Sequence, residues 1–466
     1  MALRFQNSMS RSKEEFVPLE DGKVGLYTCG PTIYNYAHIG NFRAYIFEDL
    51  LKRYLQYRGY VVKHIMNLTD VEDKLIRTCR ETGESLKSIT EKYAAAFFED
   101  LDTLGIVRAE AYPAATDHIP EMIKLIKQLR ENGHTYEDNG SIYFKISSYE
   151  EYGKLSHMDL EQLQAGGSGR VDSDEYESDD ARDFALWKAY TEEDGDVFWE
   201  TELGKGRPGW HIECSAMAMK FLGESFDIHC GGVDNLFPHH ENEIAQSECA
   251  CGKQFVKYWM HCAHLVVDGK KMSKSLGNFY TLRDLVDGKG IDPMAIRWVL
   301  VATHYRQPNN FAFDAVEAAV KSLQRIKDFR IRLGEVKGNG TDLSESIQSC
   351  REAFIHALDD DLNISGGIGA IFDFIRDVNK QLEDDAVGES GAQAAVALLD
   401  ELDAVTGLFS PSIEDDVPEE IWNMVLARQE ARRNKDFAKS DEIRDALLAE
   451  GWILEDTAEG PRVKRN

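Results

Sequence analysis

The sequence predicts an α/β protein, in which a Rossmann-like nucleotide-binding domain is split by an inserted connective segment and followed by C-terminal α-helical bundle domains. Two strand-like runs, Val24 to Thr28 and Tyr60 to Met66, flank a helical pattern that begins near His38, as in a β-α-β unit. After Pro308 the apolar spacing becomes almost entirely helical. With 466 residues and 43% apolar side chains, the chain has room for two to four domains with full cores.

Apolar spacing and turn-forming residues predict the next elements in order. Helices are expected at about Ser85 to Leu104 and Ile119 to Leu129, the second of them capped by Gly133. Alternating apolar residues predict a strand at Ser141 to Ile146, and the nucleotide-binding fold is expected to resume with Asp227 to His229.

The C-terminal part is expected to be helical throughout. One apolar stripe is formed by Val316, Leu323, Ile326 and Leu333. Beyond a Gly-containing linker at 337–341, a helical pair is predicted from about Ser344 to Phe409, and residues 411–418 form the next break. The tail from Glu419 is expected to be helical as well.

The charge balance argues against a general nucleic-acid-binding protein, because 53 basic and 82 acidic residues give a net charge of −29. The last 40 residues are neutral, so a local binding patch remains open. Part of the acidic excess lies in Asp172 to Asp180, which is expected to form a solvated, mobile loop.

Composition also sets the expected compartment. We find no run of 18 or more apolar residues, and Met1 to Arg11 lacks the apolar core of a secretion signal, so no membrane association and a cytoplasmic location are expected. The eight irregularly spaced cysteines are therefore expected to be reduced thiols or metal ligands. No surplus exposed apolar stripe is evident, which favours a monomer.

Two distant segments carry residues suited to a nucleotide triphosphate. His38-Ile39-Gly40-Asn41 stands at an expected helix N-terminus, where anions bind, although a histidine and a glycine at a helix start more often have capping and packing roles than catalytic ones. Lys271-Met272-Ser273-Lys274-Ser275 places two ammonium groups three residues apart on a small loop, which suits the grip on a triphosphate whose charge redistributes.

These segments resemble the two signatures of class I aminoacyl-tRNA synthetases, and the closest match is the cysteinyl-tRNA synthetase family. The resemblance covers nearly the whole chain. It includes Gly209 to Met217, Phe237 to Glu243 and the stretch from Asp268 to Asn278. The first signature often ends in His, whereas this chain has Asn41, which can donate a hydrogen bond but cannot carry charge.

The resemblance implies a zinc site made by Cys29, Cys214, His239 and Glu243. The spacing of His239 and Glu243, four apart in a helical stretch, agrees with a shared face, and the donor set suits tetrahedral zinc. From the residues alone, buried inert thiols would explain Cys29 and Cys214 better than a metal site does, and Cys230, Cys249 and Cys251 would compete as ligands.

The resemblance also implies the substrates: L-cysteine, ATP with Mg²⁺, and tRNA(Cys), with zinc selecting the cysteine thiol over the serine hydroxyl. The catalytic residues would be His38, Lys271 and Lys274. The ATP-binding residues would be His38, Gly40, Asn41, Lys271, Ser273 and Lys274. The amino-acid site would include Cys29, Thr69, Trp210, His229 and Asp234, although ordinary structural roles compete for Thr69, Trp210 and His229.

The spacing of several basic residues in the tail could place them on one helical face, and the resemblance implies that this face binds tRNA. The residues expected to bind tRNA are Arg428, Arg432, Lys435, Phe437 and Arg444. A solvated charged face is the competing explanation. The expected domains are a split catalytic domain at 1–133 and 202–307, a connective insert at 134–201, a helical stem-contact region at 308–336, a helical domain at 342–410 and an anticodon-recognition domain at 419–466. Two alternatives stay open at this point: a related ATP-dependent ligase that joins cysteine to an amino sugar, and a catalytically inactive zinc-containing or tRNA-binding module.

Overall fold

A computed structural model describes residues 2–157, 170–171, 183–409, 419–433, 436–450, 452–457 and 460–465. The chain divides into two compact units, Met1–Leu408 and Phe409–Asn466, and each is described by itself. The acidic segment from Asp172 to Asp180 lies outside the described residues.

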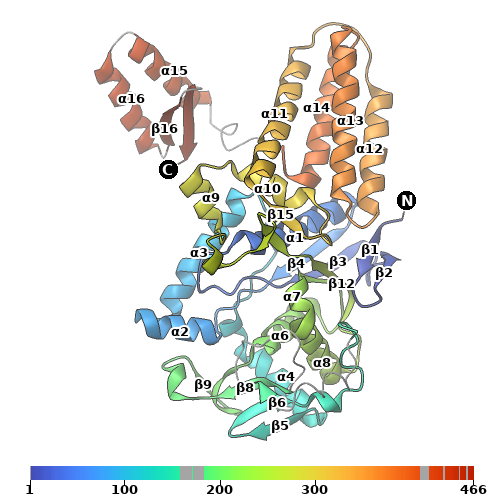
Figure 1. Ribbon diagram of the computed structural model, residues 1–466, viewed down its shortest axis with the longest axis vertical. Helices are drawn as coiled ribbons and strands as arrows, with labels where there is room; N and C mark the ends of the chain where they lie inside the picture. Colours follow the sequence, from blue (N-terminus) through green and yellow to red (C-terminus); the bar gives the residue numbers. More distant parts are fainter. Residues whose placement is uncertain are drawn as a thin grey trace. The chain divides into compact units, whose positions relative to one another are not determined.

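The core of the first unit is a four-stranded parallel sheet in the order β12-β11-β3-β4. Its strands are β3 (Lys23–Thr28), β4 (Val61–Met66), β11 (Phe226–Gly232) and β12 (Val256–Cys262). Helix α1 (Ile39–Tyr57) connects β3 to β4, which confirms the expected β-α-β unit (Figure 1). Strand β4 lies on one side of β3 and strand β11 lies on the other, so the strand order reverses between β3 and β11. Parallel sheets bind ligands at the carboxyl ends of the strands at such a switch point.

The predicted insert at 134–201 lies within a sheet in the order β5-β6-β8-β10-β9, whose strand β10 extends beyond the predicted end of the insert; the pairs along this order are antiparallel, and β7 pairs in parallel with β8. The strands are β5 (Thr135–Asp138), β6 (Ser141–Phe144), β7 (Arg170–Val171), β8 (Asp183–Ala189), β9 (Trp199–Thr201) and β10 (Gly204–Pro208). The expected helices before it are α3 (Leu86–Thr103), with Ser85 as its N-cap, and α4 (Ile119–Glu131), which ends just before Gly133 at φ +83°.

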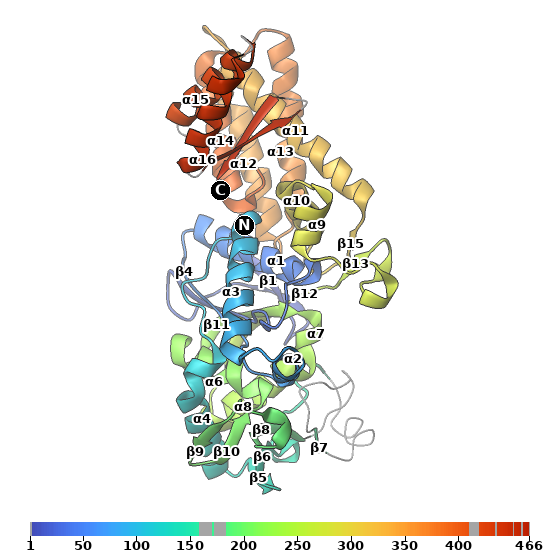
Figure 2. The same ribbon diagram turned by 90° about the vertical axis from the view of Figure 1, so that its left-hand side faces the viewer.

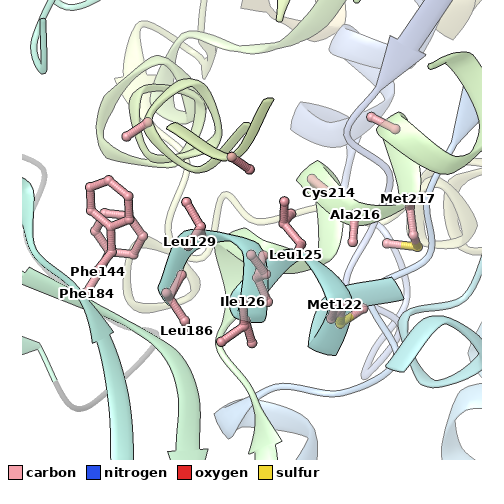
Figure 3. Packing of buried hydrophobic residues seen from close by; sticks show 14 of the residues in the cluster. Met122, Leu125, Ile126, Leu129, Phe144, Phe184, Leu186, Cys214, Ala216 and Met217 are labelled. Atoms are coloured by element: carbon pink, nitrogen blue, oxygen red, sulfur yellow. The ribbon is translucent and has the colours of Figure 1, made fainter. Parts of the chain in front are cut away.

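Helix α4 joins this sheet to the rest of the first unit. Its buried residues Met122, Leu125, Ile126 and Leu129 belong to one core cluster with aromatic side chains of the insert and with α6 (Trp210–Leu222), as Figure 3 shows. Cys214 on α6 is part of this cluster. The insert therefore fixes the position of the helix that presents Cys214.

The C-terminal part of the first unit is a helical bundle. It consists of α11 (Phe313–Glu335), α12 (Ser344–Asp359), α13 (Ile364–Glu383) and α14 (Glu389–Thr406). The prediction of a helical pair from about Ser344 to Phe409 was wrong, because the helical stretch is interrupted twice, at 360–363 and at 384–388, and three helices result. Three members of the predicted stripe on α11 are buried, namely Val316, Ile326 and Leu333.

Shorter elements complete the first unit. They are β1 (Arg4–Asn7), β2 (Ser12–Glu15), α2 (Asp73–Thr82), η1 (Ala115–His118), η2 (Ile146–Ser148), η3 (Glu192–Asp194), α7 (Val233–Asn235), η4 (Leu236–His240), α8 (Glu241–Cys251), β13 (Leu265–Val267), β14 (Lys270–Lys271), η5 (Lys274–Leu276), α9 (Leu282–Lys289), α10 (Pro293–Ala302) and β15 (Asn309–Phe311). Among the described helices, none combines the length and apolar character needed to cross a bilayer.

The second unit contains two helices, α15 (Glu419–Arg433) and α16 (Phe437–Ala449), followed by the antiparallel strands β16 (Trp452–Thr457) and β17 (Gly460–Arg465). The expectation of a wholly helical tail was therefore wrong. Trp452 of β16 packs into a small core with Ile421, Val425 and Leu447. The burial of this indole against the two helices explains why the end of the chain forms a hairpin.

Candidate active site

The first signature forms the N-terminus of α1. His38 is the N-cap, and its Nδ1 accepts a hydrogen bond from the backbone N–H of Asn41 (3.2 Å). The Asn41 Oδ1 accepts one in return from the His38 N–H (3.1 Å), which completes a capping box. Asn41 therefore has a structural role in orienting His38, and the half-buried imidazole lies at the positive end of the helix dipole.

The second signature lies directly against this helix start. The Ile39 N–H donates to the carbonyl oxygen of Tyr280 (3.0 Å), and the rings of His38 and Phe279 meet edge to face at 5.1 Å. A Cβ added to Gly40 would lie 3.2 Å from Met272 Cε, so the glycine leaves room for the loop. The structure thus brings together two segments that are more than 230 residues apart in the sequence.

The loop residues differ in their exposure. Lys271 is exposed on β14, and the half-buried Ser273 shares a hydrogen bond with Ser275 (2.8 Å between the two hydroxyl oxygens). Lys274 begins the short helix η5, and its side chain lies outside the described residues. The two lysines therefore flank a compact turn beside the N-terminus of α1.

Four possible metal donors converge at the carboxyl ends of β3 and β11. One ligand atom from each of Cys29, Cys214, His239 and Glu243 lies within 4.8 Å of the others, and the last three residues are at most 2% exposed. The donors of a tetrahedral zinc shell lie roughly 3.3–3.8 Å apart, as bond lengths of about 2.0–2.3 Å require. Small side-chain adjustments would therefore bring this set to the spacing that zinc needs, and two thiolates favour zinc over harder metals.

Hydrogen bonds link this cluster to neighbouring imidazoles. Glu243 Oε2 shares a hydrogen bond with His229 Nε2 (3.1 Å), and Glu243 Oε1 lies 3.1 Å from His239 Nε2 as an ion pair. Cys29 Sγ lies 3.3 Å from His240 Nε2. A second donor set, Cys29 with His229, His240 and Glu243, therefore also lies within 4.8 Å, and it shares two members with the first.

The cluster holds two ionised acids next to a protonated histidine. A hydrogen bond from Cys29 lowers the pKa of Cys214 to about 6, against the opposing effect of burial, whereas the same bond raises the pKa of Cys29 well above its usual value. Burial alone would lower the pKa of His239, but the charges of Cys214 and Glu243 raise it to about 10. Burial would raise the pKa of Glu243, yet His229 and His239 hold it below its usual value.

The expected amino-acid-site residues occupy different positions around this cluster. Trp210, the first residue of α6, stacks on His239 with ring centroids 4.3 Å apart, and His229 lies in β11, fully buried. Thr69 is buried beyond β4, where its N–H donates to Pro31 O (3.1 Å) and its carbonyl oxygen accepts from Ile33 (3.0 Å). Asp234 is exposed on α7, just beyond the carboxyl end of β11.

The sequence interpretation missed three polar residues of the second layer. His211 Nδ1 shares a hydrogen bond with His239 Nδ1 (2.7 Å). His261 Nε2 shares one with His240 Nδ1 (2.9 Å), and its Nδ1 shares another with Ser8 Oγ (2.7 Å). The available signal was position, since His211 follows Trp210 and His261 is the next-to-last residue of a strand parallel to β11.

The competing thiols have another explanation. Burial raises the pKa values of Cys230, Cys249 and Cys251, and within the described part of the chain none of the three joins a metal-binding cluster. They remain neutral thiols in the fold.

The residues singled out for tRNA do not share one helical face. Arg428 lies in α15 and is only 5% exposed, whereas the exposed Arg444 lies in α16, where it pairs with Asp441 (3.4 Å). Arg432 is exposed on α15, Lys435 lies outside the described residues, and so does the side chain of Phe437. The chain ends one helix at 433 and starts another at 437, so the predicted continuous face was wrong.

Comparisons with known proteins agree with this geometry. The family described as "tRNA synthetases class I (C) catalytic domain" matches residues 15–321, and the "DALR domain" matches residues 353–410. The chain is 49% identical over 471 residues to a cysteine–tRNA ligase of Brachyspira hyodysenteriae (strain ATCC 49526 / WA1), with 99% of each chain covered. It is 48% identical over 481 residues to a cysteine–tRNA ligase of Chlamydia trachomatis serovar A, with full coverage of both.

Solved structures are similar at the level of the fold. Mycobacterium tuberculosis methionyl-tRNA synthetase in complex with methionyl-adenylate matches with a TM-score of 0.62 and 14% identity, over 83% of this chain and 90% of that one.

Proposed function

Because this chain belongs to the cysteine–tRNA ligase family of class I tRNA synthetases, it is a ligase that joins cysteine to tRNA with ATP, and we propose which of its residues carry the reaction. The buried cluster of Cys29, Cys214, His239 and Glu243 beneath Trp210 carries the proposal. It lies at the switch point of the parallel sheet, at the carboxyl end of β3, and a nucleotide would lie at this edge of the sheet.

The cluster would hold zinc and select the substrate side chain. The shape of a pocket alone can favour cysteine over serine by no more than about 10²-fold in kcat/KM, because the two side chains differ by one atom. When bound, zinc supplies a Lewis acid that holds a thiolate far better than a neutral hydroxyl. Trp210 would close one side of the pocket by its stacking on His239. Asp234, just beyond the carboxyl end of β11, would attract the ammonium group of the amino acid.

The activation step joins the carboxylate of cysteine to the α-phosphate of ATP and releases pyrophosphate. Negative charge moves towards the leaving group, so electrostatic stabilisation dominates over proton transfer. His38 and the N-terminus of α1 would hold phosphate oxygens, and Gly40 leaves room for His38 and for Met272 of the lysine loop. Lys271 and Lys274 would hold the departing pyrophosphate, and ATP would bring its own Mg²⁺.

The transfer step moves the activated cysteine to the terminal ribose hydroxyl of tRNA(Cys). The second unit, with Arg432 and Arg444 exposed on its two helices, would contact the anticodon end. An acceptor of amino-sugar type, or loss of catalysis, has no support among the relatives, whose names are those of tRNA ligases over the full chain length.

The experiment that tests the metal assignment compares the two overlapping donor sets. Cys214→Ala removes a residue unique to the proposed set, and His240→Ala removes one unique to the alternative set. We expect Cys214→Ala to lose bound zinc and cysteine-dependent ATP–pyrophosphate exchange, while His240→Ala keeps its zinc. The reverse pattern of zinc content would replace the proposed ligands by His229 and His240.

A further inference from the structure

Asn278 joins the two ends of the loop that carries the lysines. Its Oδ1 accepts a hydrogen bond from the backbone N–H of Ser273 (2.8 Å), and its Nδ2 donates to the carbonyl oxygen of Lys271 (3.2 Å). Gly277, at φ +66°, turns the chain back so that Asn278 reaches these groups. One half-buried amide thus closes the loop from Lys271 to Asn278 into a ring.

The residues that follow Asn278 are attached to the other signature. Phe279 lies against the ring of His38, and the Tyr280 carbonyl oxygen accepts from the Ile39 N–H (3.0 Å). This segment between β13 and α9 is drawn in yellow-green in Figure 2. Asn278 therefore stands at the junction between the fixed start of α1 and the main chain of the lysine loop.

We propose that Asn278 is a positioning residue for the formation of cysteinyl-adenylate. Its side-chain amide fixes the main chain of the lysine loop in position relative to His38. Lysine side chains are long and flexible, so their value to the reaction depends on how well the main chain beneath them is fixed beforehand. The inference rests on the proposed function, because the loop is needed only while pyrophosphate departs. It assigns to Asn278 an effect on activation and none on the later transfer of cysteine to tRNA.

The matched control is Asn310, in the neighbouring strand β15. Its Oδ1 accepts a hydrogen bond from the Gly269 N–H (2.8 Å), so a side-chain amide is also bound to the turn between β13 and β14, but the side-chain amide that binds Lys271 O and Ser273 N is that of Asn278. Asn310→Ala should therefore leave activation unchanged. Loss of the two hydrogen bonds in Asn278→Ala should slow activation by roughly 30-fold, which corresponds to about 2 kcal/mol.

The two steps are measured separately on the full-length protein. Single-turnover pyrophosphate release with ATP and cysteine reports activation, and transfer to tRNA from preformed enzyme-bound adenylate reports the second step. For Asn278→Ala we expect the slower activation with a KM for cysteine within about twofold of the parent, and an unchanged transfer rate. Asn278→Asp keeps the hydrogen-bond acceptor and loses the donor, so its activation rate should lie between those of the parent and of Asn278→Ala. This variant provides the test if the alanine variant does not fold.

Unchanged activation in Asn278→Ala, or an equal loss in both steps, would overturn the role of Asn278. An inactive parent protein would instead contradict the proposed function, so the two failures are distinguishable. Thermal unfolding of all variants separates a local effect from loss of the fold.

Discussion

Replacement of Gly40 by alanine separates the catalytic role of the helix start from its structural role. A Cβ at this position would lie 2.9 Å from His38 Nδ1 and 3.2 Å from Met272 Cε. Ordinary contacts begin at about 3.4 Å, so the imidazole must move by about 0.5 Å and the loop by a few tenths of an ångström. The substitution therefore displaces His38 and the second signature together.

Stability and activity should respond differently to this change. Alanine in place of glycine favours a helix by roughly 0.5–1 kcal/mol. Weakening of the cap between His38 and Asn41 costs about 1 kcal/mol, so the net change in the free energy of unfolding is expected to stay within about 1 kcal/mol of zero. Activation should fall by roughly 10- to 100-fold, since misplacement of a catalytic group by 1 Å can cost about 10²-fold.

The assay is cysteine-dependent ATP–pyrophosphate exchange together with thermal unfolding. Gly369→Ala is the matched control, because Gly369 lies in helix α13 and a Cβ there would meet nothing within 4 Å. This control should gain the helical stabilisation and keep full exchange. Full exchange in Gly40→Ala would refute the reasoning, and loss of exchange accompanied by an equally large loss of stability would assign the effect to folding instead.

Two further predictions concern the metal and the tail. Because Cys29 has a raised pKa and that of His239 is about 10, both hold protons at neutral pH and must lose them to bind zinc. The apparent zinc affinity, measured by chelator competition, should thus rise by about two powers of ten for each pH unit between about pH 6.5 and 8.5, and a flat profile would contradict these protonation states. A chain ending at Ser410, close to the boundary between the two units, should retain pyrophosphate exchange and lose aminoacylation of tRNA; loss of both activities would contradict the proposed division between the units.

Local patterns in the sequence were sufficient for the central fold. The strand before His38 was predicted within one residue of Lys23–Thr28, and the start of the helix was predicted within one residue of Ile39, because alternation, helical spacing and capping are properties of neighbouring residues. The resemblance supplied the four residues that the structure brings together as a possible metal site. Spacing alone would have related His239 to Glu243 and left the two cysteines unassigned.

Contacts between distant residues account for what the sequence did not predict. The strand from Trp452 exists because its indole packs on the helices α15 and α16 and its backbone pairs with β17. His261 reaches the cluster through His240 only because β12 lies beside β11. The hydrogen bonds of Asn278 depend on the left-handed turn at Gly277, which the signature motif does not reveal.

The most direct test of the central claim is ATP–pyrophosphate exchange by the purified protein with cysteine and with serine, with zinc content determined on the same sample. The account predicts exchange with cysteine, none above background with serine, and one zinc per chain. Equal exchange with serine, or exchange with cysteine in zinc-free protein, would contradict the role of the cluster formed by Cys29, Cys214, His239 and Glu243 in selecting the substrate.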